Sequence, residues 1–438
     1  MSSDSSSSSA YRTRFEEGQW SGAVIGLGYV GLPLLVAAAS RGHGMIGFDV
    51  SEPTIGRLNS GVSHVGDVSG EDLKTVLDAG AKFTTDPTLL ADADVIFICV
   101  PSPLGRNRQP DLTYIEAAAD TVASIARPGQ LVSLESTTYP GTTEDIIVPR
   151  LEEAGLTVDK DVFVAFSPER VSPGDELKTA EIPKVVGGVT GLSGDVAEAV
   201  YSQLVPSVHR VSSSRAAEMA KLLENTYRAV NIGLINEMSQ LAHELEIDIW
   251  EVIDAAATKP FGFQPFYPGP GVGGHCIPLD PQYLSWRARE ANFATRFIDT
   301  ADQVNTKMPR YNVDRIAAVL NDRGLPVHGT KLLAVGTAYK PNVADDRESA
   351  SLLVIDELIA RGGTINVYDP VVGSERIASL GYEPVTDPDE SGPYEMAVLL
   401  TDHNVLDLKK IAESVPVVFD TRDAYRRNGI EAENVVTL

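Results

Sequence analysis

Three glycines near the start of the chain constrain its fold more than any other feature. They lie in Gly26-Leu-Gly28-Tyr29-Val-Gly31, after an apolar strand expected at 21–25 and before an Ala- and Leu-rich helix expected at 34–40. In this spacing the first glycine allows a tight turn, the second lets a pyrophosphate approach, and the third packs helix on strand. Asp49 ends the next expected strand, near the ~20-residue offset at which an acid binds the ribose hydroxyls of a dinucleotide. Because its charge would repel a 2′-phosphate, the stretch predicts a domain that binds NAD rather than NADP. A glycine-rich turn without a ligand is the weaker alternative.

Short apolar strands alternate with helical segments along most of the chain. Further strands are expected at 94–100, 131–134, 162–166 and 184–186, and a second series at 331–335, 364–368, 396–400 and 416–419. This alternation is typical of α/β folds with parallel, doubly wound sheets, in which ligands bind at the carboxyl ends of the strands. We therefore expect a disordered tail at 1–19, a Rossmann-like domain at 20–212, a helical region at 213–324 and a second Rossmann-like domain at 325–438. The second series lacks the glycine spacing, so its domain should hold a different ligand.

The composition limits the compartment and the partners. Only Cys99 and Cys276 occur in 438 residues, so we expect no disulfide framework and a reducing cytoplasm. The serine-rich start resembles no signal peptide, and no apolar run is long enough to span a bilayer. A formal net charge of −25 argues against nucleic acid and anionic membranes as partners. A phosphorylated small ligand remains compatible, because local cations and helix N-termini can bind it.

The segment 213–246 is expected to form one long helix that carries two stripes. An apolar stripe predicts a packed face and consists of Met219, Leu223, Val230, Leu234, Met238 and Leu241. A second stripe is largely polar and consists of Lys221, Asn225, Arg228, Ile232 and Asn236. Polar groups in line usually form a solvated face, but they also suit a lined pocket. Further helices are expected at 248–258, 280–292 and 298–323.

Between these helices lies Gly269-Pro-Gly-Val-Gly-Gly274-His-Cys276-Ile-Pro-Leu-Asp280. Its glycines and prolines favour turns and let a ligand approach the backbone closely. Cys276 is then either a nucleophile that faces this ligand or a small buried hydrophobe, which is the commonest fate of a free cysteine. The loop by itself leaves both alternatives open.

Six motifs follow one another along the chain. They are the glycine fingerprint, Ser136-Thr-Thr-Tyr-Pro-Gly-Thr-Thr, Ser167-Pro-Glu-Arg, Lys221-x-x-x-Asn225, Gly273-Gly-x-Cys-x-x-x-Asp280 and Tyr339-Lys-x-x-x-x-Asp-x-Arg-Glu-Ser. Together they resemble the UDP-glucose/GDP-mannose dehydrogenase family over residues 20–425. The resemblance implies an NAD-binding domain, a central helical region that forms a homodimer or higher homo-oligomer, and a UDP-binding C-terminal domain. It also implies oxidation of the C6 alcohol of a UDP-sugar to a carboxylate with two NAD⁺.

The same resemblance implies roles for individual residues. Cys276, as the thiolate, would add to the aldehyde made by the first oxidation, and the second oxidation would give a thioester that water hydrolyses. Lys221 and Asn225 would face the oxyanion, Asp280 would act with an ordered water, and Glu169 would activate the hydrolytic water. The cofactor contacts are expected from Gly26, Gly28, Tyr29, Gly31, Asp49, Ser102, Thr137 and Arg347. The substrate contacts are expected from Arg170, Lys221, Asn225, Arg228, Tyr267, Gly274, Lys340 and Arg422. We assign no metal site.

The chain departs from the UDP-glucose branch of this family at several positions. Leu279 stands where that branch commonly has Lys, and Lys259-Pro-Phe-Gly-Phe replaces an Arg-bearing segment. The run from Glu135 to Gly141 most resembles UDP-N-acetylglucosamine 6-dehydrogenases, so UDP-GlcNAc is the expected sugar, with UDP-N-acetylmannosamine and UDP-glucose as alternatives. Arg228 would then meet the acetamido group. Thr54 replaces an Arg that the family often has, which would weaken one cofactor phosphate contact.

Two other functions stay open. A single-hydride dehydrogenase of the 3-hydroxyacid or 6-phosphogluconate type shares the Rossmann domain and the Lys-x-x-x-Asn helix. It lacks the motif from Cys276 to Asp280 and the second α/β domain, which argue against it here. A non-catalytic regulator that binds NAD or a UDP-sugar would have no need of the Cys, Lys, Asn, Asp and Glu together.

Overall fold

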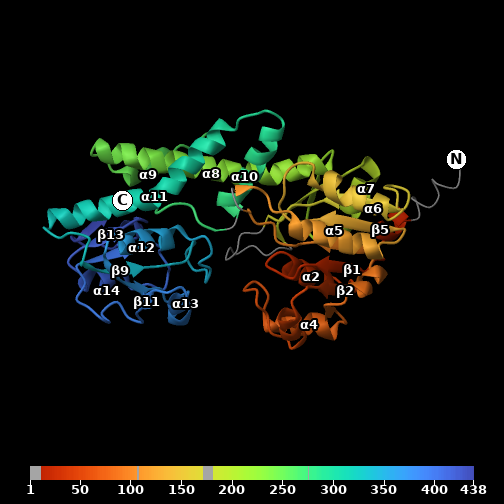
Figure 1. The fold of residues 1–438 in the computed structure, drawn as a ribbon, viewed down its shortest axis with the longest axis horizontal. Helices are drawn as coiled ribbons and strands as arrows, with labels where there is room; N and C mark the ends of the chain where they lie inside the picture. Colours follow the sequence, from red (N-terminus) through yellow and green to blue (C-terminus); the bar gives the residue numbers. More distant parts are fainter. Residues whose placement is uncertain (1–10, 106–107, 171–180, 275) are drawn as a thin grey trace. The chain divides into compact units, whose positions relative to one another are not determined.

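The computed structural model describes residues 11–105, 108–170, 181–274 and 276–438 (Figure 1). These residues form two compact units. The first ends at Glu224 and adds Gln282–Phe293, and the second comprises Asn225–Pro281 and Ala294–Leu438. The long helix α8 (Ser214–Glu244) and the helix α10 (Cys276–Glu290) contribute residues to both units. Each unit contains one sheet whose strands lie between helices (Figure 1).

The first unit is built on an eight-stranded sheet with the order β3-β2-β1-β4-β5-β6-β7-β8. Its strands are β1 (Gly22–Ile25), β2 (Met45–Phe48), β3 (Lys82–Thr84), β4 (Val95–Ile98), β5 (Gln130–Leu134), β6 (Val162–Phe166), β7 (Lys184–Gly188) and β8 (Val208–Arg210). The order of the first six strands is that of a dinucleotide-binding Rossmann sheet. The expectation of a wholly parallel sheet is wrong at one point, because β7 pairs with β6 in the antiparallel direction.

The register of the sheet brings five strand ends level with one another. Ile25 is paired with Phe48 on one side and with Ile98 on the other, Ile98 is paired with Leu134, and Leu134 with Phe166. Residues that follow these strands therefore emerge at one edge of the sheet. This carboxyl edge is where ligands bind in open α/β sheets.

Helices cover both faces of this sheet. They are α2 (Gly31–Ala39), α3 (Glu52–Asn59), α4 (Gly70–Asp78), the 3₁₀ segment η1 (Pro87–Asp92), α5 (Thr113–Ile125), the π-helical segment η3 (Thr143–Ile147), α6 (Val148–Glu153) and α7 (Gly191–Tyr201). Alternate residues of the central strands enter two separate apolar clusters, as Phe97 and Ile98 do. A parallel sheet buried on both faces explains why its strands are apolar throughout.

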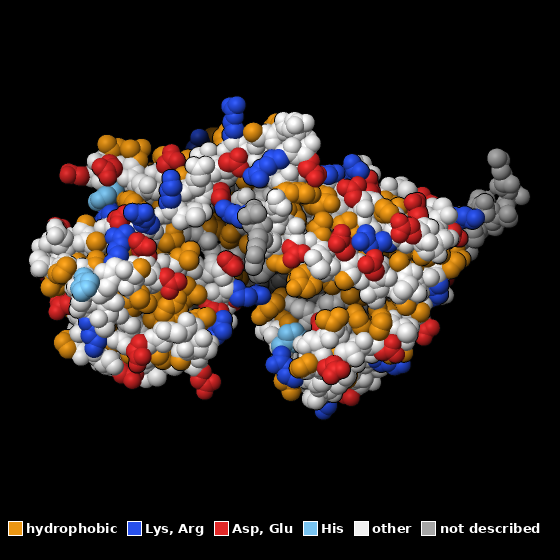
Figure 2. Space-filling model, in the orientation of Figure 1, with side chains coloured by type: hydrophobic (Ala, Val, Ile, Leu, Met, Phe, Trp, Pro, Cys, Tyr) orange, Lys and Arg blue, Asp and Glu red, His pale blue; other side chains and the backbone are white. Residues whose placement is uncertain are grey.

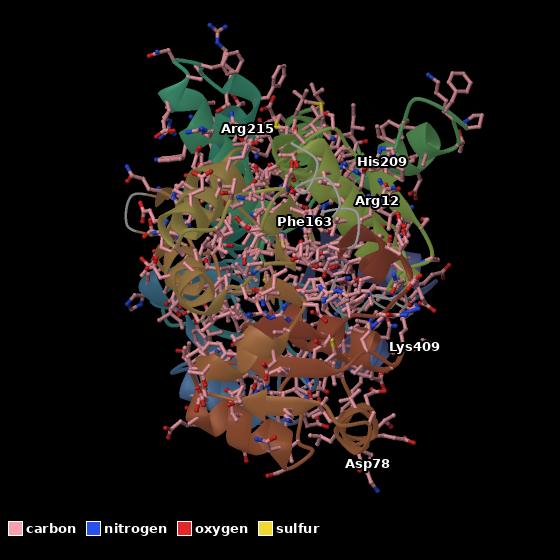
Figure 3. The ribbon with its side chains drawn as sticks, turned by 90° about the vertical axis from the view of Figure 1, so that its right-hand side faces the viewer. Arg12, Asp78, Phe163, His209, Arg215 and Lys409 are labelled. Atoms are coloured by element: carbon pink, nitrogen blue, oxygen red, sulfur yellow. The ribbon has the colours of Figure 1, made fainter. Side chains whose placement is uncertain are left out.

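Part of the segment expected as an N-terminal tail is structured. Residues 1–10 lie outside the described residues, but 11–16 form a helical segment. Phe15 is fully buried and its ring lies 6.5 Å from that of Phe163, which is surrounded by side chains in Figure 3, whereas Asp78 at the end of α4 points outward. The expectation of a disordered tail through residue 19 is therefore wrong for this part.

The second unit repeats the topology of the first. Its six-stranded sheet is parallel throughout with the order β11-β10-β9-β12-β13-β14. The strands are β9 (Lys331–Val335), β10 (Thr364–Tyr368), β11 (Glu383–Pro384), β12 (Met396–Leu399), β13 (Val418–Asp420) and β14 (Val435–Thr437). The helices are α9 (Ile249–Ala257), α11 (Arg296–Asp322), α12 (Ala350–Ala360), α13 (Ser374–Ser379), α14 (Leu408–Glu413) and α15 (Ala424–Arg427). Two doubly wound sheets with a long central helix confirm the expected fold class.

Two helices begin earlier than the sequence indicated. Helix α2 begins at Gly31 rather than near residue 34, and α10 begins at Cys276 rather than at Asp280. The helix was expected only from Asp280 because the prolines near Cys276 favour a loop. Pro278 lies among the first four residues of α10, whose N–H groups have no partner within the helix in any case, so it costs the helix nothing.

Among the described residues, no helix has both the length and the apolar character needed to cross a bilayer. Acidic and basic side chains are interspersed over the face drawn in Figure 2.

Candidate active site

The three fingerprint glycines meet different surroundings at the end of β1. Gly26 has a φ of +91°, and a Cβ there would lie 2.7 Å from the carbonyl oxygen of Cys99. A Cβ on Gly31 would lie 1.9 Å from the carbonyl oxygen of Gly26. A Cβ on Gly28 would have no atom within 4 Å. The chain itself therefore requires glycine at the first and third positions, whereas the second faces open space that a ligand can use.

Asp49 is fixed beside this turn. It follows β2 directly, its Oδ2 accepts the N–H of Leu27 at 3.0 Å, and its Oδ1 accepts the N–H of Ser51 at 3.0 Å. Each carboxylate oxygen has further lone pairs for ribose hydroxyls. Tyr29 is 43% exposed in the same turn. The open space at Gly28 and the oriented acid fit the diphosphate and ribose of a dinucleotide.

The Thr-rich segment after β5 reaches the same edge of the sheet. Ser136 donates to the carbonyl of Val100 at 2.8 Å, and the hydroxyls of Thr138 and Thr142 lie 2.5 Å apart. Thr137 lies between the buried residues Ser136 and Thr138 and is itself partly exposed. Ser102, after β4, accepts a hydrogen bond from the hydroxyl of Tyr283 through its carbonyl at 3.0 Å. The structure thus places both predicted cofactor contacts at the carboxyl edge of the first sheet.

Glu169 follows β6 and meets a lysine from α8. The Nζ of Lys221 donates to the main-chain carbonyl of Glu169 at 2.5 Å, and only 6% of Lys221 is exposed. The N–H of Arg170 donates to Oε1 of Glu169 at 2.6 Å. The guanidinium of Arg170 is paired with Glu224 at 2.8 Å, so a substrate phosphate would have to compete with that carboxylate.

In the second unit, Cys276 and Asp280 lie one turn apart on α10. Cys276 is exposed and Asp280 is buried. The amide nitrogen of Asn225 donates to Oδ2 of Asp280, and Arg228 donates to the amide oxygen of Asn225. Spacing of i and i+4 places the thiol and the carboxyl on one face of the helix. Because the first turn of a helix presents free N–H groups, this position also favours negative charge on the sulfur.

The glycine-rich stretch before Cys276 packs closely against the second sheet. A Cβ on Gly273 would lie 2.9 Å from the Cβ of Tyr339, and one on Gly274, whose φ is +81°, would lie 2.8 Å from the ring of Tyr339. A Cβ on Gly269 would lie 2.8 Å from Nη1 of Arg422. From the sequence, these glycines were expected to let a ligand approach the backbone closely. The contacts show that the chain's own packing already requires them.

The cations predicted for the UDP end lie around the second sheet. Arg422 donates from Nε to the carbonyl of Leu400 at 2.7 Å, and Lys340 follows Tyr339 on the segment after β9. Arg347, predicted near the NAD, is on the same segment and makes a two-pronged ion pair with Asp345 at 2.6–3.1 Å. Arg347 therefore belongs to the second unit, and its predicted contact with NAD stays a prediction.

Tyr267 is partly exposed and stacks on Trp250, with 6.0 Å between ring centroids, while Arg427 lies over its ring at 5.6 Å.

Asp369, the acidic residue after a strand of the second sheet, explains why the ligand of this sheet should differ from the dinucleotide of the first. Asp369 follows β10, as Asp49 follows β2, but its Oδ2 accepts the N–H of Thr337 at 2.7 Å and lies 3.3 Å from Nε2 of His403. Burial raises the pKa of Asp369, but the hydrogen bonds from His403 and the backbone outweigh it and lower that pKa below its ordinary range. This carboxylate is enclosed by its own loops and is not available to a ribose.

The two stripes of α8 lie in different environments. The polar residues Lys221, Asn225 and Asn236 are buried, whereas Leu234 is 56% and Leu241 is 49% exposed. The expectation that the apolar stripe packs within the chain is wrong. The polar stripe is not a solvated face either, because its side chains are hydrogen-bonded to Glu169, Asp280 and neighbouring residues.

The sequence interpretation missed a buried group of charges beside Glu169. Lys184 at the start of β7 contacts Glu135 after β5, and its Nζ lies 3.9 Å from Oε2 of Glu169. The hydroxyl of Tyr201 donates to the other oxygen of Glu135 at 2.6 Å. The only signal in the sequence was a charged residue at the edge of each of two apolar strands.

Comparisons with known proteins identify the family of the chain. Family models of the UDP-glucose/GDP-mannose dehydrogenase family match the NAD binding domain at residues 22–205, the central domain at 215–307 and the UDP binding domain at 333–427. The chain is 34% identical over 410 residues to a UDP-N-acetyl-D-glucosamine 6-dehydrogenase of Pseudomonas aeruginosa, which covers 91% of this chain and 96% of the relative. It is also 34% identical over 422 residues to a UDP-N-acetyl-D-mannosamine dehydrogenase of Methanococcus maripaludis, covering 92% and 93%.

A solved structure, a UDP-D-ManNAc dehydrogenase from Pyrococcus horikoshii, superimposes with a TM-score of 0.85 at 31% identity and covers 95% of this chain and 98% of its own. The chain therefore belongs to the UDP-glucose/GDP-mannose dehydrogenase family of NAD-dependent oxidoreductases.

Proposed function

We propose that this enzyme oxidises the C6 alcohol of UDP-N-acetyl-D-glucosamine to the carboxylate in two successive steps. The observation that carries the proposal is the arrangement on α10, where an exposed Cys276 precedes a buried Asp280 that Asn225 holds in place. A single-hydride dehydrogenase has no use for a thiol at this position. Retention of an aldehyde for a second oxidation requires one.

Cys276 supplies the covalent step. Its thiolate adds to the carbonyl carbon of the aldehyde to give a thiohemiacetal, and oxidation of that adduct gives a thioester. When bound at the fingerprint, NAD⁺ accepts one hydride in each of the two oxidations. Asp280, one turn below the sulfur, is placed to exchange a proton with the reacting oxygen through a water. Asn225 orients Asp280 and presents an amide to the same oxygen.

Residues of the first unit supply charge and a base. Lys221 carries a buried ammonium group that would stabilise the oxyanion of the aldehyde adduct, where a donor in a low-dielectric site has its largest effect. Glu169 would take a proton from the water that hydrolyses the thioester. Thr137 is the partly exposed hydroxyl of its segment and would hold that water or the cofactor.

The UDP end would be bound by the second unit. Lys340 and Arg422 would pair with the diphosphate, since both lie near the glycine-rich stretch of residues 269–274. Arg422 is the better oriented of the two because its Nε is already fixed on Leu400. Tyr267, which contacts Trp250 and Arg427 through its ring, is partly exposed and would contribute its hydroxyl edge.

The sugar is the finer part of the proposal. Leu279 and the run from Glu135 to Gly141 favour an N-acetylhexosamine over glucose, and the relative from P. aeruginosa is named for UDP-GlcNAc. Arg228, which bonds to Asn225, would then face the acetamido group. The test is the rate of NADH formation with UDP-GlcNAc, UDP-ManNAc and UDP-glucose, with the mass of each product recorded. A kcat/KM that is highest for UDP-GlcNAc supports the proposal. A higher value for either other sugar overturns the choice of sugar, and no turnover with any of them overturns the activity.

The exposed apolar stripe of α8 indicates a homodimer. Tyr227, Leu234, Leu241 and Leu245 lie on one side of the helix and its end and are each 47–59% exposed. Such residues in line on a long helix resemble half of a helix–helix interface. A reducing compartment such as the cytoplasm would keep Cys276 in its active thiol form.

A further inference from the structure

A chain of buried ionic contacts runs from the interior of the first unit to Glu169. Its members come from four elements: Glu135 after β5, Glu169 after β6, Lys184 on β7 and Tyr201 at the end of α7. Lys184 contacts Glu135 and lies 3.9 Å from Oε2 of Glu169. The side chains of Glu135 and Lys184 are 0% and 4% exposed, whereas that of Glu169 is 11% exposed. The chain therefore begins in the core and ends at the edge where ligands bind.

Buried charges of this kind are costly unless they are paired. An uncompensated carboxylate in the interior takes up a proton, because burial disfavours the charged form. Burial also lowers the pKa of Lys184, but the carboxylates of Glu135 and Glu169 outweigh it and raise the pKa of the ammonium group. Lys184 therefore keeps its positive charge next to Glu169.

A purely structural ion pair would need one lysine and one carboxylate, which Lys184 and Glu135 already form. Tyr201 supports that pair, because its O–H donates to Glu135 at 2.6 Å while its oxygen accepts from the hydroxyl of Ser133 at 2.8 Å. The second carboxylate, Glu169, lies on the ligand side of Lys184. Glu135 thus holds the ammonium group of Lys184 on the core side of Glu169, the predicted base.

We propose that Lys184, anchored by Glu135 and Tyr201, is a positioning residue that keeps Glu169 ionised and oriented for its work as a base. The inference rests on the proposed function, in which Glu169 deprotonates the water that hydrolyses the thioester. In that step the water loses a proton to Glu169, its oxygen bonds to the thioester carbon, and the bond to the sulfur of Cys276 breaks.

Other charged and titratable groups also face Glu169 and Lys184, and they contribute to the same balance. They are Glu135, Tyr201, Cys99, Arg170 and Lys221. Lys221 contacts the main-chain carbonyl of Glu169 and Arg170 donates its backbone N–H, so neither contact puts a cation on the carboxylate. Among the described residues, the ammonium of Lys184 lies within ion-pair distance of that carboxylate, at 3.9 Å.

The test is the pH dependence of turnover in Lys184→Met, with Lys184→Arg as the control that restores the charge. The Nζ of Lys184 lies 3.9 Å from Oε2 of Glu169, so Lys184→Met takes a favourable charge away from the ionised carboxylate. The acid limb of the kcat profile should therefore move upward by at least about one unit in Lys184→Met and return close to its native position in Lys184→Arg. At pH values below the acid limb of Lys184→Met, both NADH molecules should form in a rapid burst, and intact-mass measurement should find Cys276 acylated.

A second variant separates electrostatics from folding. Glu135→Gln combined with Lys184→Gln removes both partners of the buried pair, a change that proteins tolerate far better than the loss of one partner. This double variant should unfold near the native temperature and still show the displaced acid limb. An unmoved limb in both folded variants, or equal slowing of the burst and of turnover, overturns the role of Lys184.

Failure of the underlying function looks different. If Glu169→Gln hydrolyses the thioester at the native rate, Glu169 is not the base, and the proposal for Lys184 falls with it. If Glu169→Gln accumulates the acyl-enzyme while Lys184→Met keeps the native pH profile, the base assignment stands and only the inference about Lys184 is wrong.

Discussion

Alanine substitutions at Gly28 and Gly31 separate what the fold requires from what the cofactor requires. A Cβ at Gly31 would lie 1.9 Å from the carbonyl oxygen of Gly26, 2.9 Å from Cγ1 of Val24 and 3.1 Å from the Cβ of Cys99. Two of these neighbours are backbone or the first side-chain carbon, so they cannot rotate away. Overpacking typically costs 1–3 kcal/mol, and so rigid a clash should reach about 3 kcal/mol or more. For a domain of this size that loss corresponds to a fall in Tm of roughly 6–12 °C.

Gly28→Ala should behave in the opposite way. No atom lies within 4 Å of the added Cβ, so Tm without cofactor should stay within about 2 °C of the native value, which is under ~1 kcal/mol. The methyl group would occupy the open space assigned to the pyrophosphate, and the Kd for NAD⁺ should rise at least tenfold, or about 1.4 kcal/mol. Thermal unfolding without NAD⁺ and calorimetric titration with NAD⁺ provide the two readouts. Equal loss of stability in both variants, or native NAD⁺ affinity in Gly28→Ala, would refute the assignment.

The other predictions concern charge, pH and assembly. Lys221→Met should slow the first NADH-forming step by about 10²–10³-fold, which is the usual effect of losing an oxyanion donor. Arg215→Met, on the exposed side of the same helix, should leave the rate of that step unchanged within twofold. Similar rates for the two variants would contradict the role of Lys221. Burial raises the pKa of Asp420 to about 6, so its native-state carboxyl holds a proton that the unfolded state has already released. The free energy of unfolding should therefore fall by roughly 3 kcal/mol as pH rises through about 6. Asp420→Asn should remove the corresponding decrease in Tm between pH 4 and 7. A decrease that persists in this variant would show that Asp420 is not its source. If the exposed residues of α8 form the proposed dimer interface, Leu234→Glu combined with Leu241→Glu should give a monomer in sedimentation experiments, and a dimer mass for this variant would contradict that interface.

Local signals in the sequence were strong where the backbone depends on nearby residues. The spacing of Gly26, Gly28 and Gly31 with Asp49 was sufficient to predict a Rossmann sheet, because turn, strand and acid belong to one supersecondary unit. Three of the expected strands, 162–166, 331–335 and 364–368, have the same limits in the structure. Continuous apolar runs bounded by turn residues leave little choice in a sheet that is buried on both faces.

Tertiary relations were less accessible. The apolar stripe with Leu234 and Leu241 looked like a core face, but helical periodicity cannot tell a surface that packs within the chain from one that packs on another copy. The contact of Lys184 with Glu135 joins residues 49 positions apart, and no local pattern encodes it. The helix that begins at Cys276 was hidden by Pro278, since the propensity of proline against helices does not apply to the first turn.

The number of NADH molecules formed per sugar consumed tests the central claim most directly. With limiting UDP-GlcNAc and excess NAD⁺, the account predicts two NADH per sugar and a uronic acid as the only product. With Cys276→Ser in place of the native chain, it predicts loss of acid formation, because the serine hydroxyl is not ionised at neutral pH and is a far weaker nucleophile than the thiolate. One NADH per sugar with an aldehyde as the final product of the native enzyme, or two NADH and acid from Cys276→Ser at the native rate, would contradict it.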